Sequence, residues 1–159
     1  MRTGYYIGSG DENPNDNEHG TFYQMAPGTR LYNLLPFCDL MNVGDFFVRL
    51  IAQPREKLTT CLEYHVWRLE NANDRWYMGS GPTQKHGDIF GYIGRPSCGR
   101  SDLANELDFL ATYNVNPHLK AIACYSRVFG GKRCGWSIAR TETRIMLKLS
   151  SPSSFRAPG

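Results

Sequence analysis

Two stretches of the chain alternate apolar and polar residues on both sides of a short turn. The first covers residues 43–53 and 57–68, and the second covers residues 103–115 and 118–129. Successive side chains of a β-strand point to opposite faces, so a sustained alternation predicts a strand with one apolar and one polar face. A proline stands in each turn, where the strand has to break. The pattern therefore predicts two long β-hairpins in succession.

The two faces of these predicted strands differ in character. One face is apolar, and we expect it to form a continuous outward band of Phe46, Val48, Leu50, Leu62, Tyr64, Leu107, Phe109 and Tyr113. The other face carries polar and charged side chains, among them Arg49, Glu63 and Asp108. A soluble β-sandwich and a transmembrane barrel with a water-filled lumen both show this alternation, so the alternation alone leaves both open.

The connections between the predicted strands favour the barrel. The turns within the hairpins are short, whereas residues 70–101 form one long, polar loop between the hairpins. Outer-membrane barrels have short turns at one rim and long loops at the other, and aromatic residues near the strand ends. Such aromatic residues are present at Tyr64, Trp67 and Tyr113. The fold class we predict is an all-β antiparallel meander of long hairpins that forms part of a transmembrane β-barrel.

The composition limits how the chain could meet a membrane. Its 159 residues are 41% hydrophobic and 13% aromatic, which is enough for a packed core. No run approaches the roughly 18 apolar residues of a membrane helix, so any crossing has to be made by strands. The mean hydropathy of -0.45 agrees with strands, because alternation keeps the average low. The net charge of +3 is scattered and accompanies no nucleic-acid-binding motif, so nucleic acid is not a predicted partner.

The start of the sequence bears on its cellular location. Met1-Arg2-Thr3 leads into Gly4-Tyr5 without the basic, apolar and cleavage segments of a signal peptide. For an exported protein, we therefore expect this chain to be the later part of a longer, signal-peptide-bearing protein.

Metal ligands and disulfide patterns are not evident in the sequence. The cysteines are odd in number and lack a CxxC pair, which supports neither a disulfide framework nor a zinc site; they are Cys38, Cys61, Cys98, Cys124 and Cys134. Asp11, Asn13, Asn15 and Asn17 alternate as in a calcium loop, but the sixth position is Asp16 instead of glycine. We predict neither a metal nor a cofactor.

Several motifs together resemble one protein family. The first group is Gly20-Thr21-Phe22-Tyr23-Gln24-Met25-Ala26-Pro27, followed by Leu40-Met41-Asn42. The second is Asp74-Arg75-Trp76-Tyr77, and the third runs from Glu106-Leu107-Asp108 to Asn116-Pro117-His118. From about residue 4 to residue 131 the chain resembles the carboxyl-terminal part of the alginate export family of outer-membrane β-barrel porins.

The resemblance implies an outer-membrane channel without catalytic activity. A uronate polymer or a related anionic solute would pass through a wide pore lined by polar and basic side chains, and outer-membrane lipid would surround the wall. Wide channels need about 16 to 18 strands, whereas this chain offers about 5 or 6. We therefore expect residues 1–132 to be part of an incomplete barrel that needs missing upstream strands or further copies. Residues 133–159 form a tail of divergent composition, in which 143–149 is a candidate closing strand.

The candidate solute-contacting residues lie on the polar strand face and in the long loop. They are Arg49, Glu63, His65, Trp67, Arg75, Trp76, Tyr77, Arg95, Arg100 and Asp108. Basic side chains in a lumen would concentrate a polyanion, and a guanidinium can meet two carboxylate oxygens at once. The alternative for Arg49 is an ion pair with Glu63 or Asp108 that stiffens the wall. No catalytic residues are predicted, because His65 or Tyr64 as a base would lack a second catalytic element.

A soluble carbohydrate-binding β-sandwich is the rival hypothesis. It would use Trp67, Trp76 and Tyr77 as stacking platforms for sugar rings. It would also need a second sheet over the apolar band, since two sheets bury their apolar faces against each other. The burial of the apolar band therefore distinguishes the two hypotheses.

Overall fold

A computed structural model describes most of the chain. The described residues are 1–13, 15–25, 37–79, 81, 85–87, 91–130, 132–133, 136–138 and 140–149. The elements found among them are the strands β1 (Arg2–Gly8), β2 (Val43–Arg55), β3 (Leu58–Arg68), β4 (Trp76–Gly79), β5 (Tyr92–Arg95), β6 (Asp102–Asn116), β7 (Leu119–Phe129), β8 (Lys132–Arg133), β9 (Trp136–Ser137) and β10 (Arg140–Leu149).

Six of these strands form one sheet in the order β1-β2-β3-β6-β7-β10. Every neighbouring pair is antiparallel. The sequence placed four of these strands at 43–53, 57–68, 103–115 and 118–129, where the structure has β2, β3, β6 and β7. The predicted fold class, an antiparallel meander of long hairpins in an unclosed barrel wall, is confirmed.

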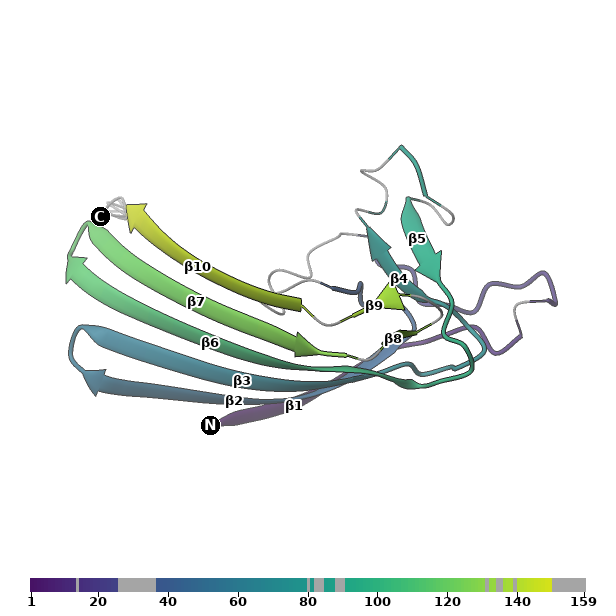
Figure 1. The fold of residues 1–159 in the computed structure, drawn as a ribbon, viewed down its shortest axis with the longest axis horizontal. Coiled ribbons are helices and arrows are strands. Elements are labelled where there is room, and N and C mark those ends of the chain that lie inside the picture. Colours follow the sequence, from purple (N-terminus) through teal and green to yellow (C-terminus); the bar gives the residue numbers. More distant parts are fainter. Residues whose placement is uncertain are drawn as a thin grey trace, which may run out of the picture.

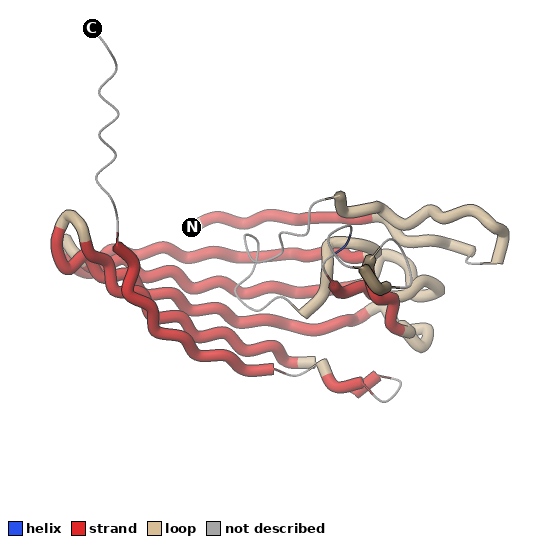
Figure 2. Tube along the Cα trace, turned by 90° about the horizontal axis from the view of Figure 1, so that it is seen from above, coloured by secondary structure: helices blue, strands red, loops and turns tan. Residues whose placement is uncertain are grey.

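The large sheet is curved, and its two ends differ (Figure 1). The tight turns β2–β3 and β6–β7 lie together at one end, and the longer connections emerge at the other end. We call these the tight-turn end and the loop end. The small β4–β5 sheet stands at the loop end on the concave side (Figure 1), and in Figure 2 the strands of the large sheet lie side by side along their length.

The apolar band lies on the convex face. Exposure lies between 39% and 47% for six members: Phe46, Leu50, Leu62, Tyr64, Phe109 and Tyr113. Val48 and Leu107 are half-buried. Within the described ranges, the three sheets of the fold include none that pairs with the convex face as the second layer of a sandwich.

The loop between the hairpins corrects one expectation. Residues 70–101 were expected to be an irregular loop, but they contain the strands β4 and β5, with Trp76 opposite Arg95 in register. The hairpin folds inward because its aromatic residues bury apolar surface against the concave side of the large sheet. The resulting core at the loop end includes Phe37, Val43, Trp67, Leu69, Trp76, Leu103 and Val128.

The edge strands extend the sheet beyond the four predicted strands. The sequence analysis missed β1, whose Tyr5 and Ile7 alternate with Gly4 and Tyr6. Gly8 ends this strand next to the backbone of Leu40. A Cβ atom on Gly8 would stand 2.5 Å from the backbone oxygen of Leu40, so this close approach requires glycine. At the other edge, β10 includes the candidate segment 143–149 and begins three residues earlier. Residues 150–159 lie outside the described part of the chain.

Candidate functional site

Charged side chains line the concave face from mid-sheet to the tight-turn end. Arg2 lies opposite Arg49 across β1 and β2, and Lys120 lies opposite Lys148 across β7 and β10. Facing residues of an antiparallel pair share a face, so each pair sets two positive charges side by side. Arg144 follows on the same face of β10. This half of the concave face therefore carries more basic than acidic side chains.

Carboxylates offset part of this positive charge, among them Asp108, which lies opposite Glu63 across β3 and β6. Glu63 on β3 accepts a hydrogen bond from Nε of Arg49 on β2. Glu142 forms an ion pair with Arg144 within β10. The Arg49–Glu63 contact is the ion-pair alternative for Arg49, and it leaves 32% of the arginine side chain exposed. Arg49 is thus both part of the wall and open to the concave space.

At the loop end, the polar residues of four adjacent strands form a buried network. Nδ1 of His65 lies 2.8 Å from Oδ2 of Asp45, and His65 stacks on Trp67 with ring centroids 5.6 Å apart. Nε1 of Trp67 donates to Oε2 of Glu106 over 3.2 Å, and Oγ of Ser126 donates to Oε1 of Glu106 over 3.2 Å. These hydrogen bonds link side chains of β2, β3, β6 and β7 away from water, which fixes the relative positions of the four strands.

The burial of this network corrects three of the predicted solute contacts. His65 and Trp67 are 1% exposed, and Asp108 is 1% exposed on the same face of β6. Phe37 packs edge-on against Trp67 with ring centroids 5.6 Å apart. Side chains as buried as these offer almost no surface to a solute on the concave side. The sequence showed their face correctly but gave no sign of what covers it.

The predicted aromatic contacts of the long loop are also buried. Trp76 is 5% exposed and Tyr77 is 1% exposed, so neither offers a face for stacking on a sugar ring. Arg95 lies with its guanidinium carbon 5.7 Å from the centre of the Trp76 ring, and its Nε donates to the sulfur of Met78. Trp76 and Tyr77 anchor the loop, and the Arg95 side chain contacts Trp76 and Met78 of β4.

The anchor of Tyr77 is Asp74, which joins three segments of the loop end. Tyr77 donates its hydroxyl to Oδ1 of Asp74 over 2.8 Å, and burial is the main cause that raises the pKa of Tyr77. The other oxygen of Asp74 accepts from the hydroxyl of Thr21 over 2.6 Å and from the backbone N–H of Asp11 over 3.0 Å. A buried carboxylate with this many donors is a strong cross-link between loops.

Asn42 is a second cross-link, and the sequence analysis assigned it no role. Its side-chain amide donates to the carbonyls of Asn71 and Arg75 over 2.9 Å each, while its oxygen accepts the N–H of Asn71 over 2.8 Å. Asn42 is fully buried and has a φ of 52°, a left-handed conformation that asparagine tolerates better than most residues. The only signal was its place in the Leu40-Met41-Asn42 motif.

Asp39 is a buried acid beside this cross-link. Its backbone N–H donates to the carbonyl of Tyr77 over 2.8 Å, and within the described part of the chain its Oδ2 lacks a hydrogen-bond partner. Burial raises the pKa of Asp39 to about 7. Burial also raises the pKa of the nearby Tyr92 to about 12, with the charge of Asp39 as a second cause.

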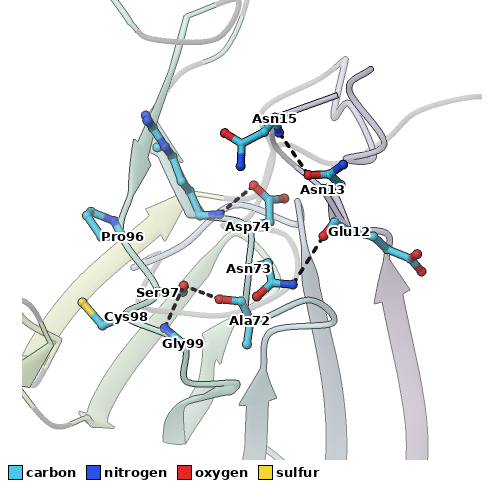
Figure 3. Close-up of a pocket in the computed structure, with 12 residues that line it drawn as sticks. Glu12, Asn13, Asn15, Ala72, Asn73, Asp74, Pro96, Ser97, Cys98 and Gly99 are labelled. Carbon is cyan, nitrogen blue, oxygen red and sulfur yellow. Dashed lines mark hydrogen bonds between the residues drawn. The ribbon is translucent and has the colours of Figure 1, made fainter. Parts of the chain in front are cut away.

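A polar pocket of about 700 Å³ opens among the loops (Figure 3). Its lining includes Glu12, Asn13, Asn15, Asn73 and the predicted residue Arg75. The amide of Asn73 donates to the carbonyl of Glu12 over 3.3 Å, which ties the two sides of the pocket together. Amide, carboxylate and guanidinium groups in such a pocket can hydrogen-bond the hydroxyls of a polar solute. Arg100, by contrast, lines a separate pocket near the ends of β3 and β7.

The cysteines take two states. Cys38, Cys61 and Cys124 are free thiols, and burial raises the pKa of Cys38 well above its usual value. Cys98 is disulfide-bonded, so the chain contains a cross-link that the sequence analysis did not expect. Cys134 lies outside the described residues.

Comparison with known families agrees with this architecture. The family model described as Alginate export matches residues 1–147. The chain belongs to the alginate export family. This is an outer-membrane family of transport channels and not a family of enzymes, and its members are associated with polysaccharide passage. The match extends past residue 131 and includes most of β10. No curated protein and no solved structure matches the chain.

Among the described residues there is no helix of the length and hydropathy needed to span a bilayer.

Proposed function

We propose that this chain forms part of the wall of an outer-membrane channel through which an anionic polysaccharide passes. The concave face lines the lumen, and the convex face contacts lipid. The observation that carries the proposal is the difference between the two faces of one open sheet. Large apolar side chains such as Leu62 and Phe109 are exposed on the convex face, and the half-buried Arg49 keeps 32% of its side chain exposed on the concave face. A water-soluble protein would gain no stability from that exposed apolar band.

The dimensions of the band support a lipid-facing role. On β6 the exposed apolar residues continue past the band to Val115, and Leu107 to Val115 spans about 26 Å at the usual rise of a strand. A strand tilt of about 40° reduces this to about 20 Å along the bilayer normal, which is most of the roughly 25 Å apolar height of outer-membrane barrels. Aromatic residues such as Tyr113 stand near the end of the band, where interface girdles occur.

The edges of the sheet support a need for further strands. In the described sheet, β1 and β10 each pair with one neighbour. Backbone groups at an open edge cannot find hydrogen-bond partners in lipid, at a cost of several kcal/mol each. We infer that β1 and β10 pair with further strands of a longer chain, or with further copies, in the closed channel.

The basic half of the concave face supports an anionic solute. Lys120, Lys148 and Arg144 extend the positive surface from Arg49 toward the tight-turn end. Weak, repeated contacts with a cationic wall attract a polyanion without trapping it. Arg49 contacts the solute through the part of its side chain that Glu63 leaves exposed.

The test is solute entry through the full-length protein reconstituted in phosphatidylcholine vesicles. Uronate oligomers are compared with neutral oligosaccharides of equal length by the rate of vesicle swelling. We expect faster entry of the uronate, and an at least severalfold loss of this preference in a Lys120→Gln/Lys148→Gln double variant. Lys57→Gln, in the turn outside the lumen, is the matched control. Equal entry of both solutes, or recovery of the protein as a soluble monomer, would contradict the proposal.

A further inference from the structure

The β4–β5 hairpin stands on the concave side of the large sheet, which the proposed function assigns to the lumen. Trp76, at the start of β4, belongs to the same core as Trp67 of β3 and Val128 of β7. Trp67 points to the same face of β3 as Glu63, four residues earlier. From this base the two strands of the hairpin rise away from the large sheet at its loop end (Figure 1). The hairpin therefore projects from the wall into the mouth of the lumen.

The length of the hairpin is considerable beside the width of such a channel. β4 and β5 have 4 residues each, which is about 13 Å at the usual rise of a strand. A barrel of about 16 to 18 strands, tilted by about 40°, has a backbone radius of about 16–18 Å, or about 12 Å inside the side chains of the wall. A hairpin about 10 Å thick then fills on the order of a third of the open cross-section.

Buried hydrogen bonds hold the base of the hairpin in place. Asp74 accepts from the hydroxyl of Tyr77, and the backbone N–H of Asp39 donates to the carbonyl of Tyr77. The amide of Asn42 donates to the carbonyl of Arg75, the residue before β4. Swinging the hairpin out of the lumen would leave several of these buried groups without partners, at a cost of about 1–3 kcal/mol each. The hairpin is thus a fixed part of the mouth.

The chain between β1 and β2 supports the hairpin from another side. Tyr92, the first residue of β5, is fully buried in a cluster with Tyr77 and Met41. Its ring meets that of Tyr23 edge-on with centroids 6.0 Å apart, and its hydroxyl donates to the carbonyl of Gln24. The aromatic side chains of the hairpin therefore serve to hold it upright.

We propose that the β4–β5 hairpin is a fixed constriction that makes the channel selective for linear polysaccharides. A linear chain enters a narrowed mouth end-on, whereas a branch point doubles the width that has to pass. The basic half of the concave face then selects by charge, and the hairpin selects by shape. The proposal rests on the proposed function, so insertion and conductance of the wild type are measured separately.

The first test shortens the hairpin in the full-length protein. Tyr77 and Gly94 face each other in register, so an Asn-Gly turn can replace residues 78–93 and keep Trp76 in its core. Linear and branched neutral oligosaccharides of equal length are compared by vesicle swelling. We expect the wild type to admit the linear form severalfold faster and the shortened variant to lose most of this difference. The conductance should rise by about 1.2-fold or more, because at least half of the hairpin's area is removed.

The second test leaves the fold intact and adds bulk to the hairpin. Lys85 lies between β4 and β5 and is exposed. A large, membrane-impermeant maleimide on Lys85→Cys should lower the conductance and slow the branched solute further. Lys57→Cys, in the exposed turn at the opposite end, is the matched control and should change neither. Wild type treated with the same reagent accounts for reaction at the half-buried Cys61 and Cys124.

The results separate this proposal from the channel itself. Equal entry of linear and branched solutes into the wild type, or unchanged selectivity in an inserted shortened variant, would overturn the constriction. A label at Lys85→Cys that leaves the conductance unchanged would do the same, and this measurement decides if the shortened variant does not insert. A wild type that neither floats with vesicles nor conducts would contradict the proposed function, whereas failure of the constriction alone leaves its conductance and uronate preference in place.

Discussion

The contrast between the two faces of the sheet leads to a quantitative prediction. Leu62 on β3 and Ile51 on β2 lie at nearly the same level along their strands. Leu62 pairs with Leu50, and Ile51 pairs with Cys61, so their levels differ by one residue. Both are aliphatic, with exposures of 40% and 53%, but Leu62 is on the convex face and Ile51 is on the concave face. They are therefore matched positions, but the proposed function places Leu62 against lipid and Ile51 in the water-filled lumen.

Arginine at each position should separate the two media. On the lipid face near mid-bilayer, Leu62→Arg is expected to destabilise the folded protein by about 2–4 kcal/mol. This equals a factor of about 30 to 700 in the folding equilibrium constant. On the concave face the new guanidinium stays in water, so Ile51→Arg is expected to cost less than about 0.5 kcal/mol, as for an ordinary exposed site.

The measurement is urea titration of the full-length protein folded in phosphatidylcholine vesicles, with the folded fraction read from heat-modifiable gel mobility. The free energies of unfolding of both variants are compared with that of the wild type under identical conditions. Similar small losses at both positions would mean that water contacts both faces. In that case the assignment of the convex face to lipid, and with it the channel wall, would be refuted.

Three other predictions follow from single side chains. Glu63→Gln should increase the anion preference in reversal-potential measurements because it releases Arg49, while Arg49→Gln should lower it; identical potentials would rule out a lumenal Arg49. Trp67→Ala should cost about 3–5 kcal/mol in urea unfolding through lost packing, with Trp67→Phe intermediate, and a loss below about 1 kcal/mol would contradict the buried core. For Asp39, whose pKa is raised from 3.8 to about 7, the folded state favours the protonated form, so its stabilising effect is lost as pH rises through that window. The melting temperature of the wild type should therefore fall relative to Asp39→Asn between those pH values, and parallel pH profiles would disprove the raised pKa of Asp39.

The sequence by itself determined the strands and their faces. Alternation is a local property: residues such as Leu62 and Glu63 reveal opposite faces from their own neighbours, because each residue of a strand reverses the side-chain direction. The same pattern placed Arg49 and Glu63 on one face, where the structure pairs them. The motifs and the contrast of short turns with a long loop were enough to indicate the family, which the match over residues 1–147 shows.

Only the tertiary structure decided how the loop end is organised. Trp76 and Tyr77 look like exposed loop aromatics in sequence, but they are buried because the β4–β5 hairpin folds onto the concave side. The contacts that hold it there join residues far apart along the chain, as Asn42 with Asn71 and Asp74 with Thr21. Such pairings depend on where the curved sheet brings distant loops together, and no local pattern of polarity encodes that position.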